Sequence, residues 1–137
     1  MSDAAMSDTE ALLRAAAAVR LNAHAPYSRF KVGAALRADD GRLYVGANVE
    51  NASYPEGLCA EAAAIAAMVA GGGKRIVELA LVTEGADPAP PCGGCRQRLA
   101  EFADPATPLH LATTAGARRS VTLDELLPLA FSLPAPP

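Results

Sequence analysis

The chain has 137 residues, of which 51% are hydrophobic and 20% charged, a balance typical of a folded domain and not of a disordered chain. Its formal net charge of −3, with no basic block, argues against a nucleic acid polymer as partner and favours a small-molecule substrate. No apolar run reaches the roughly 18 residues of a membrane span, so no membrane partner is expected. The three cysteines are an odd number without an export signal, which predicts reduced thiols and a cytoplasmic location.

The first half of the chain predicts one helix and one hairpin. The alanine-rich stretch 11–19 follows cap candidates that begin at Ser7, and this order predicts a helix. Two short β-like runs at 31–38 and 43–48 are separated by Asp39-Asp40-Gly41, which predicts a hairpin turn.

The second half of the chain predicts alternating helices and strands. The nearly continuous apolar run at 76–83 is typical of a buried central strand, whereas Arg118 and Arg119 indicate a solvated turn. Strands that alternate with helices predict a layered α/β domain with a mixed sheet. The other elements expected here are helices at 58–70, 92–102 and 122–127 and a strand at 109–113.

The length predicts a single domain over residues 1–137. Within it, we expect a disordered start at 1–7 and a proline-rich tail at 133–137 that neither a helix nor a sheet can use.

All three cysteines occur in two short motifs, C-A-E at 59–61 and P-C-G-G-C at 91–95. Three thiolates suit a zinc ion and leave its fourth tetrahedral position open, as in a catalytic site. Glu61 is then close enough in sequence to move protons on a water at that position. Because Cys59 and Glu61 are two positions apart, both can face the metal only if Cys59 stands at the entrance of a helix.

Two other interpretations of these cysteines remain. A C-x-x-C pair can be a redox motif, although such a motif requires no third cysteine beside a glutamate. A structural zinc site would need a fourth ligand, and neither His24 nor His110 has a partner at ligand spacing.

Three further segments have a recognisable pattern: PYSRFKVGAA at 26–35, NVENASY at 48–54 and LLPLAF at 126–131. Together with the cysteine motifs, the chain from about residue 24 to 132 resembles the cytidine deaminase family, in its small homotetrameric branch with three cysteine ligands. The resemblance implies a three-layer αβα fold with a central mixed β-sheet. It also implies one Zn²⁺ per chain and a homotetramer with shared active sites.

The activity that the resemblance implies is hydrolytic deamination of cytidine and 2′-deoxycytidine to uridine and 2′-deoxyuridine plus ammonia, in pyrimidine salvage. Glu61 would be the catalytic residue, and the zinc ligands would be Cys59, Cys92 and Cys95.

The resemblance further implies a set of substrate-binding residues around the zinc. These are Asn48 and Glu50 for the ribose hydroxyls, Phe30 in the pyrimidine pocket, the Ala60 carbonyl for the exocyclic amine, Tyr54 at the subunit contact, and Phe131 stacking on the base in a neighbouring subunit. Taken singly, the two phenylalanines are equally compatible with a core position, and Asn48 and Glu50 with a turn.

One position departs from the family's pattern. Many relatives of this branch carry an arginine directly after the glutamate, where this chain has Ala62. Three thiolates around Zn²⁺ leave one net negative charge, which weakens the metal as a Lewis acid. We expect Arg96 to supply the missing positive charge, together with the helix dipoles.

Two alternative functions stay open. One is a related deaminase that acts on another aminopyrimidine nucleoside, such as blasticidin S. The other is a non-catalytic binding module stabilised by zinc, which would not need Glu61.

Overall fold

The computed structural model describes residues 6–134, and a mixed five-stranded sheet forms its centre. The strands are β1 (Gly33–Ala38), β2 (Leu43–Ala47), β3 (Ile76–Thr83), β4 (Pro108–Thr113) and β5 (Arg118–Thr122), in the spatial order β2-β1-β3-β4-β5. β1 pairs antiparallel with both β2 and β3, β3 pairs parallel with β4, and β4 pairs antiparallel with β5. The strand at 76–83 is therefore central, as its apolar composition predicts.

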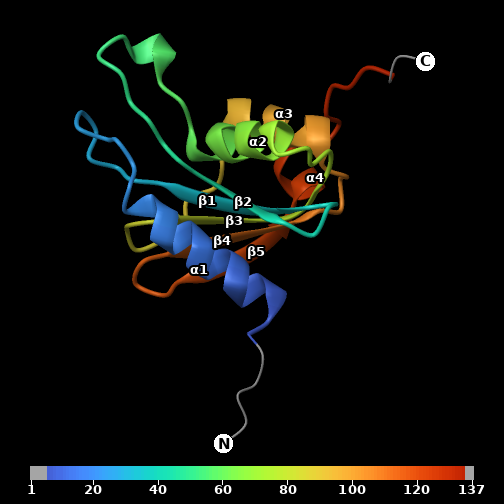
Figure 1. Cartoon of the computed structure of the whole chain (residues 1–137), viewed down its shortest axis with the longest axis horizontal. Helices are drawn as coiled ribbons and strands as arrows, with labels where there is room; N and C mark the ends of the chain where they lie inside the picture. Colours follow the sequence, from blue (N-terminus) through green and yellow to red (C-terminus); the bar gives the residue numbers. More distant parts are fainter. Residues whose placement is uncertain (1–5, 135–137) are drawn as a thin grey trace, which may run out of the picture.

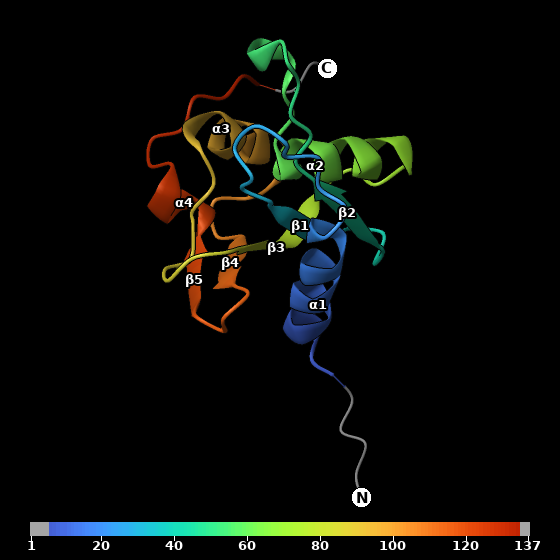
Figure 2. The same cartoon turned by 90° about the vertical axis from the view of Figure 1, so that its left-hand side faces the viewer.

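Helices cover both faces of this sheet. The helices are α1 (Asp8–Arg20), α2 (Ala60–Ala70), α3 (Gly93–Phe102) and α4 (Leu123–Leu126), with a short 3₁₀ helix at Tyr54–Glu56. α1 lies on one face, and α2, α3 and α4 lie on the other (Figures 1 and 2). The predicted three-layer αβα arrangement with a mixed sheet is confirmed.

The alternation of side chains along β3 divides the core between the two faces. Leu79 and Leu81 are buried with residues of α2 and α3, whereas Ala80 and Val82 are buried against α1. Because both faces of β3 are covered, the strand is apolar over most of its length, with Glu78 as its one charged residue.

The backbone of α2 can lie close to the sheet because one residue of β2 is a glycine. A Cβ built at Gly46 would lie 2.4 Å from the backbone nitrogen of Ala64 and 2.5 Å from the carbonyl oxygen of Ala60. Only glycine therefore lets the first turns of α2 pack directly on the sheet. This contact positions the end of α2 that carries the C-A-E motif.

The strand β5 differs from the prediction of a solvated turn at Arg118 and Arg119. Both arginines lie in this edge strand, and Arg118 Nη2 donates to Glu10 Oε2 of α1 at 3.0 Å. Val121 is the buried residue of β5. The prediction of a turn was wrong because pairing with β4 makes this segment a strand, although its polar sequence does not indicate one.

The two ends of the described chain overlap the segments predicted to be a disordered start and a proline-rich tail. Ser7 caps α1 by accepting a hydrogen bond from the Glu10 backbone N–H at 3.1 Å. The rest of the predicted start, residues 1–5, and the last part of the predicted tail, 135–137, lie outside the described residues. Over residues 6–134, no helix has both the length and the apolar character needed to cross a membrane.

Candidate active site

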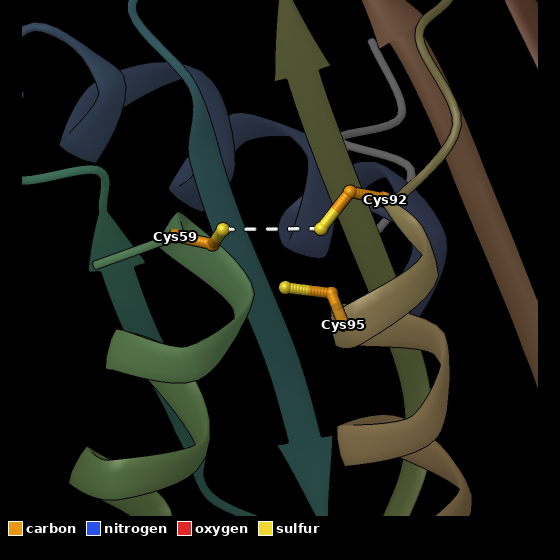
Figure 3. Close-up of side chains that lie close together, drawn as sticks. All are labelled: Cys59, Cys92 and Cys95. Carbon is orange, nitrogen blue, oxygen red and sulfur yellow. Dashed lines mark hydrogen bonds between the residues drawn. The ribbon is translucent and has the colours of Figure 1, made fainter. Parts of the chain in front are cut away.

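The N-terminal ends of α2 and α3 bring the three cysteines together. Cys59 and Cys92 occupy the N-cap positions of α2 and α3, and Cys95 lies in the first turn of α3. Their sulfur atoms all lie within 4.8 Å of one another, and Cys59 Sγ is 4.0 Å from Cys92 Sγ (Figure 3). Cys59 thus stands at the helix entrance, the position required if it and Glu61 are to face the same point.

The donor set fits a zinc ion. Tetrahedral coordination with Zn–S bonds of about 2.3 Å separates two sulfur ligands by about 3.8 Å. The observed sulfur separations come close to that value, and within residues 6–134 this metal-ligand group consists of the three cysteines alone. Three ligands would leave one position for water or substrate, which is the pattern of a catalytic site.

The environments of the three thiols differ. Burial raises the pKa of the Cys59 and Cys95 thiols, whereas the backbone N–H of Cys95 lowers the pKa of the Cys92 thiol. Zinc binds thiolates, so binding must displace protons from the Cys59 and Cys95 thiols, whose pKa values are raised.

Glu61 is buried beside this cluster. It lies in the first turn of α2, is 5% exposed, and lines the same cavity as Cys59 and Cys92. Burial raises the pKa of its carboxyl group. A carboxyl group with a raised pKa holds a proton more readily than a solvated one, which suits a group that accepts and returns protons in catalysis.

A cavity of about 410 Å³ opens in front of the cysteines. This volume falls within the range of small-molecule sites. Its lining includes the expected residues Phe30, Asn48, Glu50, Tyr54, Ala60 and Glu61, together with two of the cysteines.

The Asn48 side chain already holds part of the cavity wall. Its Oδ1 accepts the Val32 backbone N–H at 2.8 Å, and its Nδ2 donates to the Phe30 carbonyl oxygen at 2.8 Å. One amide hydrogen remains for a ligand. Structural and ligand-binding uses of Asn48 are therefore compatible.

Glu50 has a similar double use, and Ser28 is the partner that sequence reasoning missed. Glu50 Oε1 accepts the backbone N–H groups of Tyr27 and Ser28 at 3.0 and 3.1 Å, and Oε2 accepts the Ser28 hydroxyl. These bonds, first among them that of the Ser28 hydroxyl, lower the pKa of Glu50. Ser28 Oγ in turn accepts the Phe30 backbone N–H at 3.0 Å. The sequence signal that could have identified Ser28 is its place in the PYSRFKVGAA segment.

Tyr54 and Phe131 are the two aromatic residues expected at a subunit contact. Tyr54 is 77% exposed at the mouth of the cavity, and its ring meets that of Tyr27 edge-on at 6.0 Å between centroids. Phe131 is 69% exposed and lines a separate hollow beside α3 and α4. Within one chain, Phe131 is thus not brought together with the zinc ligands.

The arginine that contacts a cysteine is not the expected one. Arg96 donates to the carbonyl oxygens of Pro91 and Leu126 at 2.8 and 2.9 Å, and so ties α3 to the chain around it. Arg98, one helical turn after Cys95, donates from Nη1 to Cys95 Sγ at 3.4 Å. The role expected of Arg96 therefore stays a prediction, while the guanidinium of Arg98 is the one that lies within hydrogen-bond distance of a cysteine sulfur.

Residues 6–111 match a protein family described as the cytidine and deoxycytidylate deaminase zinc-binding region. The chain belongs to this family. Membership confirms the resemblance inferred from the cysteine motifs and the flanking segments. It also identifies the metal, because this family binds zinc and the three cysteines could hold the ion.

Individual relatives match most of the chain. The chain is 42% identical over 125 residues to a cytidine deaminase of Halalkalibacterium halodurans. This match covers 91% of this chain and 95% of the relative. It is 46% identical over 111 residues to a cytidine deaminase of Mycobacterium tuberculosis, with coverage of 81% and 80%. The crystal structure of a cytidine deaminase from Burkholderia pseudomallei superposes with a TM-score of 0.86 at 43% identity, covering 92% of this chain and 100% of that one.

Proposed function

We propose that this chain is a zinc-dependent deaminase that hydrolyses cytidine and 2′-deoxycytidine to uridine and 2′-deoxyuridine plus ammonia. The observation that carries the proposal is a cluster of three cysteine sulfurs within 4.8 Å of one another, beside the buried carboxyl group of Glu61 at the end of a cavity. Relatives named cytidine deaminase that match over most of their length support the same reaction.

The proposed mechanism makes Glu61 the proton carrier. When bound, zinc supplies Lewis acidity that makes water a nucleophile at neutral pH. The Glu61 carboxylate accepts a proton from that water and delivers it to N3 of the base, which makes C4 more electrophilic. The water oxygen forms a bond to C4, and Glu61 takes the second proton from that oxygen and passes it to the exocyclic amine. The bond from C4 to this nitrogen then breaks, which leaves the C4 carbonyl of uridine and releases ammonia.

The proposed binding mode uses the remaining lining residues. The ribose hydroxyls would meet the free amide hydrogen of Asn48 and the remaining acceptor capacity of Glu50 Oε2. Phe30 would contact the pyrimidine, and the Ala60 carbonyl would accept from the exocyclic amine. The hydrogen bond that Ser28 Oγ accepts from the Phe30 N–H and the one that Asn48 Nδ2 donates to the Phe30 carbonyl support this mode, because they hold Phe30 at the cavity.

We assign the charge-balancing role to Arg98. Its contact with Cys95 Sγ supplies a positive charge at a ligand that carries a negative charge when it binds zinc. Ala62 places no positive charge on α2 directly after Glu61, where the family resemblance implies an arginine.

The proposed assembly is a homotetramer in which neighbouring subunits share active sites. We propose that the enzyme acts in the cytoplasm and serves pyrimidine salvage. Phe131 is exposed and lines a hollow other than the cavity that holds Glu61, and this supports a role in a neighbouring subunit. Mixing a Glu61→Ala variant with a Phe131→Ala variant tests this. If the sites are shared, subunit exchange should restore part of the activity; no recovery in exchanged mixtures would contradict sharing.

The reaction itself is tested by measuring ammonia release from cytidine and 2′-deoxycytidine, with zinc content measured on the same sample. One zinc per chain with turnover of both nucleosides is expected. Bound zinc without turnover would favour the zinc-stabilised binding module. Turnover of blasticidin S but not of cytidine would favour the related deaminase.

A further inference from the structure

The floor of the cavity contains a buried hydroxyl group without a hydrogen-bond partner. Thr83 is the last residue of β3, is 2% exposed, and lines the cavity together with Leu81 and Glu61. Its Oγ1 has no partner among residues 6–134. Leu81, two positions earlier, is buried on the face that α2 and α3 cover, so Thr83 lies on the same face, below the site.

The neighbouring strand provides a direct comparison. Thr113 is the register partner of Thr83 on β4 and is 5% exposed. Its Oγ1 accepts the Ala117 backbone N–H at 3.1 Å. The same residue type at the adjacent strand end is therefore satisfied by the protein, whereas the hydroxyl of Thr83 is left for another partner.

The surroundings of Thr83 indicate what that partner is. Much of the cavity lining is apolar, including Val32, Leu81, Ala89 and Pro90. A buried hydroxyl that forms no hydrogen bond destabilises a folded protein, and such groups are few in native structures. An unpartnered hydroxyl in an apolar part of a binding cavity fits a contact that forms only when a polar ligand enters.

We propose that the Thr83 hydroxyl hydrogen-bonds the polar edge of the bound pyrimidine base. This inference rests on the proposed function, since it takes a cytosine nucleoside as the ligand. A hydroxyl group can donate or accept by rotating about its C–O bond. Thr83 can therefore serve the amine of the substrate and the carbonyl of the product in turn, which a fixed donor or acceptor cannot.

The test compares Thr83→Val, Thr83→Ser and Thr113→Val in the zinc-loaded enzyme. Thr83→Val replaces the hydroxyl with a methyl group, so KM for cytidine should rise roughly two- to tenfold, the equivalent of one neutral hydrogen bond. The same variant should melt at a higher temperature than wild type without ligand, because the unpaired hydroxyl is gone. Thr83→Ser should keep a KM near that of wild type.

Thr113→Val is the matched control. It removes a hydroxyl that already has a protein partner, so it should lower the melting temperature and leave KM unchanged. The opposite signs of the two melting shifts separate a ligand contact from a structural hydroxyl.

An unchanged KM in Thr83→Val, with uridine affinity by calorimetry also unchanged, would overturn the proposal. A lower melting temperature in Thr83→Val would do so too, because it would mean that the protein itself satisfies the hydroxyl. Both outcomes leave wild-type turnover of cytidine intact. Failure of the proposed function would instead appear as a folded, zinc-loaded wild type that releases no ammonia.

Discussion

Replacing Arg98 with methionine should weaken zinc binding and slow turnover. The guanidinium Nη1 lies 3.4 Å from Cys95 Sγ, where a full charge pair at an effective dielectric constant of about 20 would be worth roughly 5 kcal/mol. The Arg98 side chain is exposed, so solvent screens the interaction, and the net value of hydrogen bonds to charged groups starts at about 1.5 kcal/mol. We therefore expect about a tenfold loss of zinc affinity.

The assay is competition for zinc against a chromophoric chelator, combined with kcat/KM measured at saturating zinc. Arg118→Met is the matched control, because Arg118 is exposed and pairs with Glu10 away from the site. An arginine introduced at Ala62 should restore part of the lost affinity. If Arg98→Met and Arg118→Met bind zinc equally well, the charge-balancing role of Arg98 is refuted.

Three further predictions concern the groups around the zinc site. Glu61→Gln should lower kcat by at least about 100-fold with zinc stoichiometry unchanged; near-normal ammonia release would exclude Glu61 as the proton carrier. Gly46→Ala should lower both the melting temperature and zinc retention, because the added Cβ would lie 2.4 Å from the Ala64 backbone nitrogen, whereas a Cβ at Gly93 meets nothing within 4 Å. Equal melting temperatures for Gly46→Ala and Gly93→Ala would contradict this. The pKa of Glu50 is lowered in the fold, so its stabilising effect is present above the unfolded value of about 4.3 and lost as pH falls through the folded value. The melting advantage of wild type over Glu50→Gln should therefore shrink below about pH 4, and an advantage that stays constant from pH 7 to pH 3 would count against the Glu50 hydrogen bonds.

Local sequence patterns were sufficient for most of the secondary structure. The alanine-rich segments predict α1 and α2, and the apolar run predicts the central strand β3, because helix propensity and burial on both faces leave a signature in consecutive residues. β5 had no such signature. Its strand conformation depends on pairing with β4, and the polar residues of this edge strand do not indicate that contact.

The zinc site was also accessible from sequence, because ligand type and spacing are local properties. Cys92 and Cys95 are one helical turn apart, and Cys59 precedes Glu61 at a helix start, so the chemistry follows once both helices are recognised. The structure added that the two helix ends meet, with all three sulfurs within 4.8 Å.

By itself, then, the sequence predicted the family and the layered fold, both of which are confirmed, and it singled out the three cysteines and Glu61 as a candidate site. Only the tertiary structure decided that Arg98 and not Arg96 contacts a ligand, that Ser28 holds Glu50, and that the hydroxyl of Thr83 is unpartnered in the cavity floor. Each of these depends on which way a side chain points and on what a distant segment offers it. Such contacts are set by packing between elements, and residue order along the chain does not encode them directly.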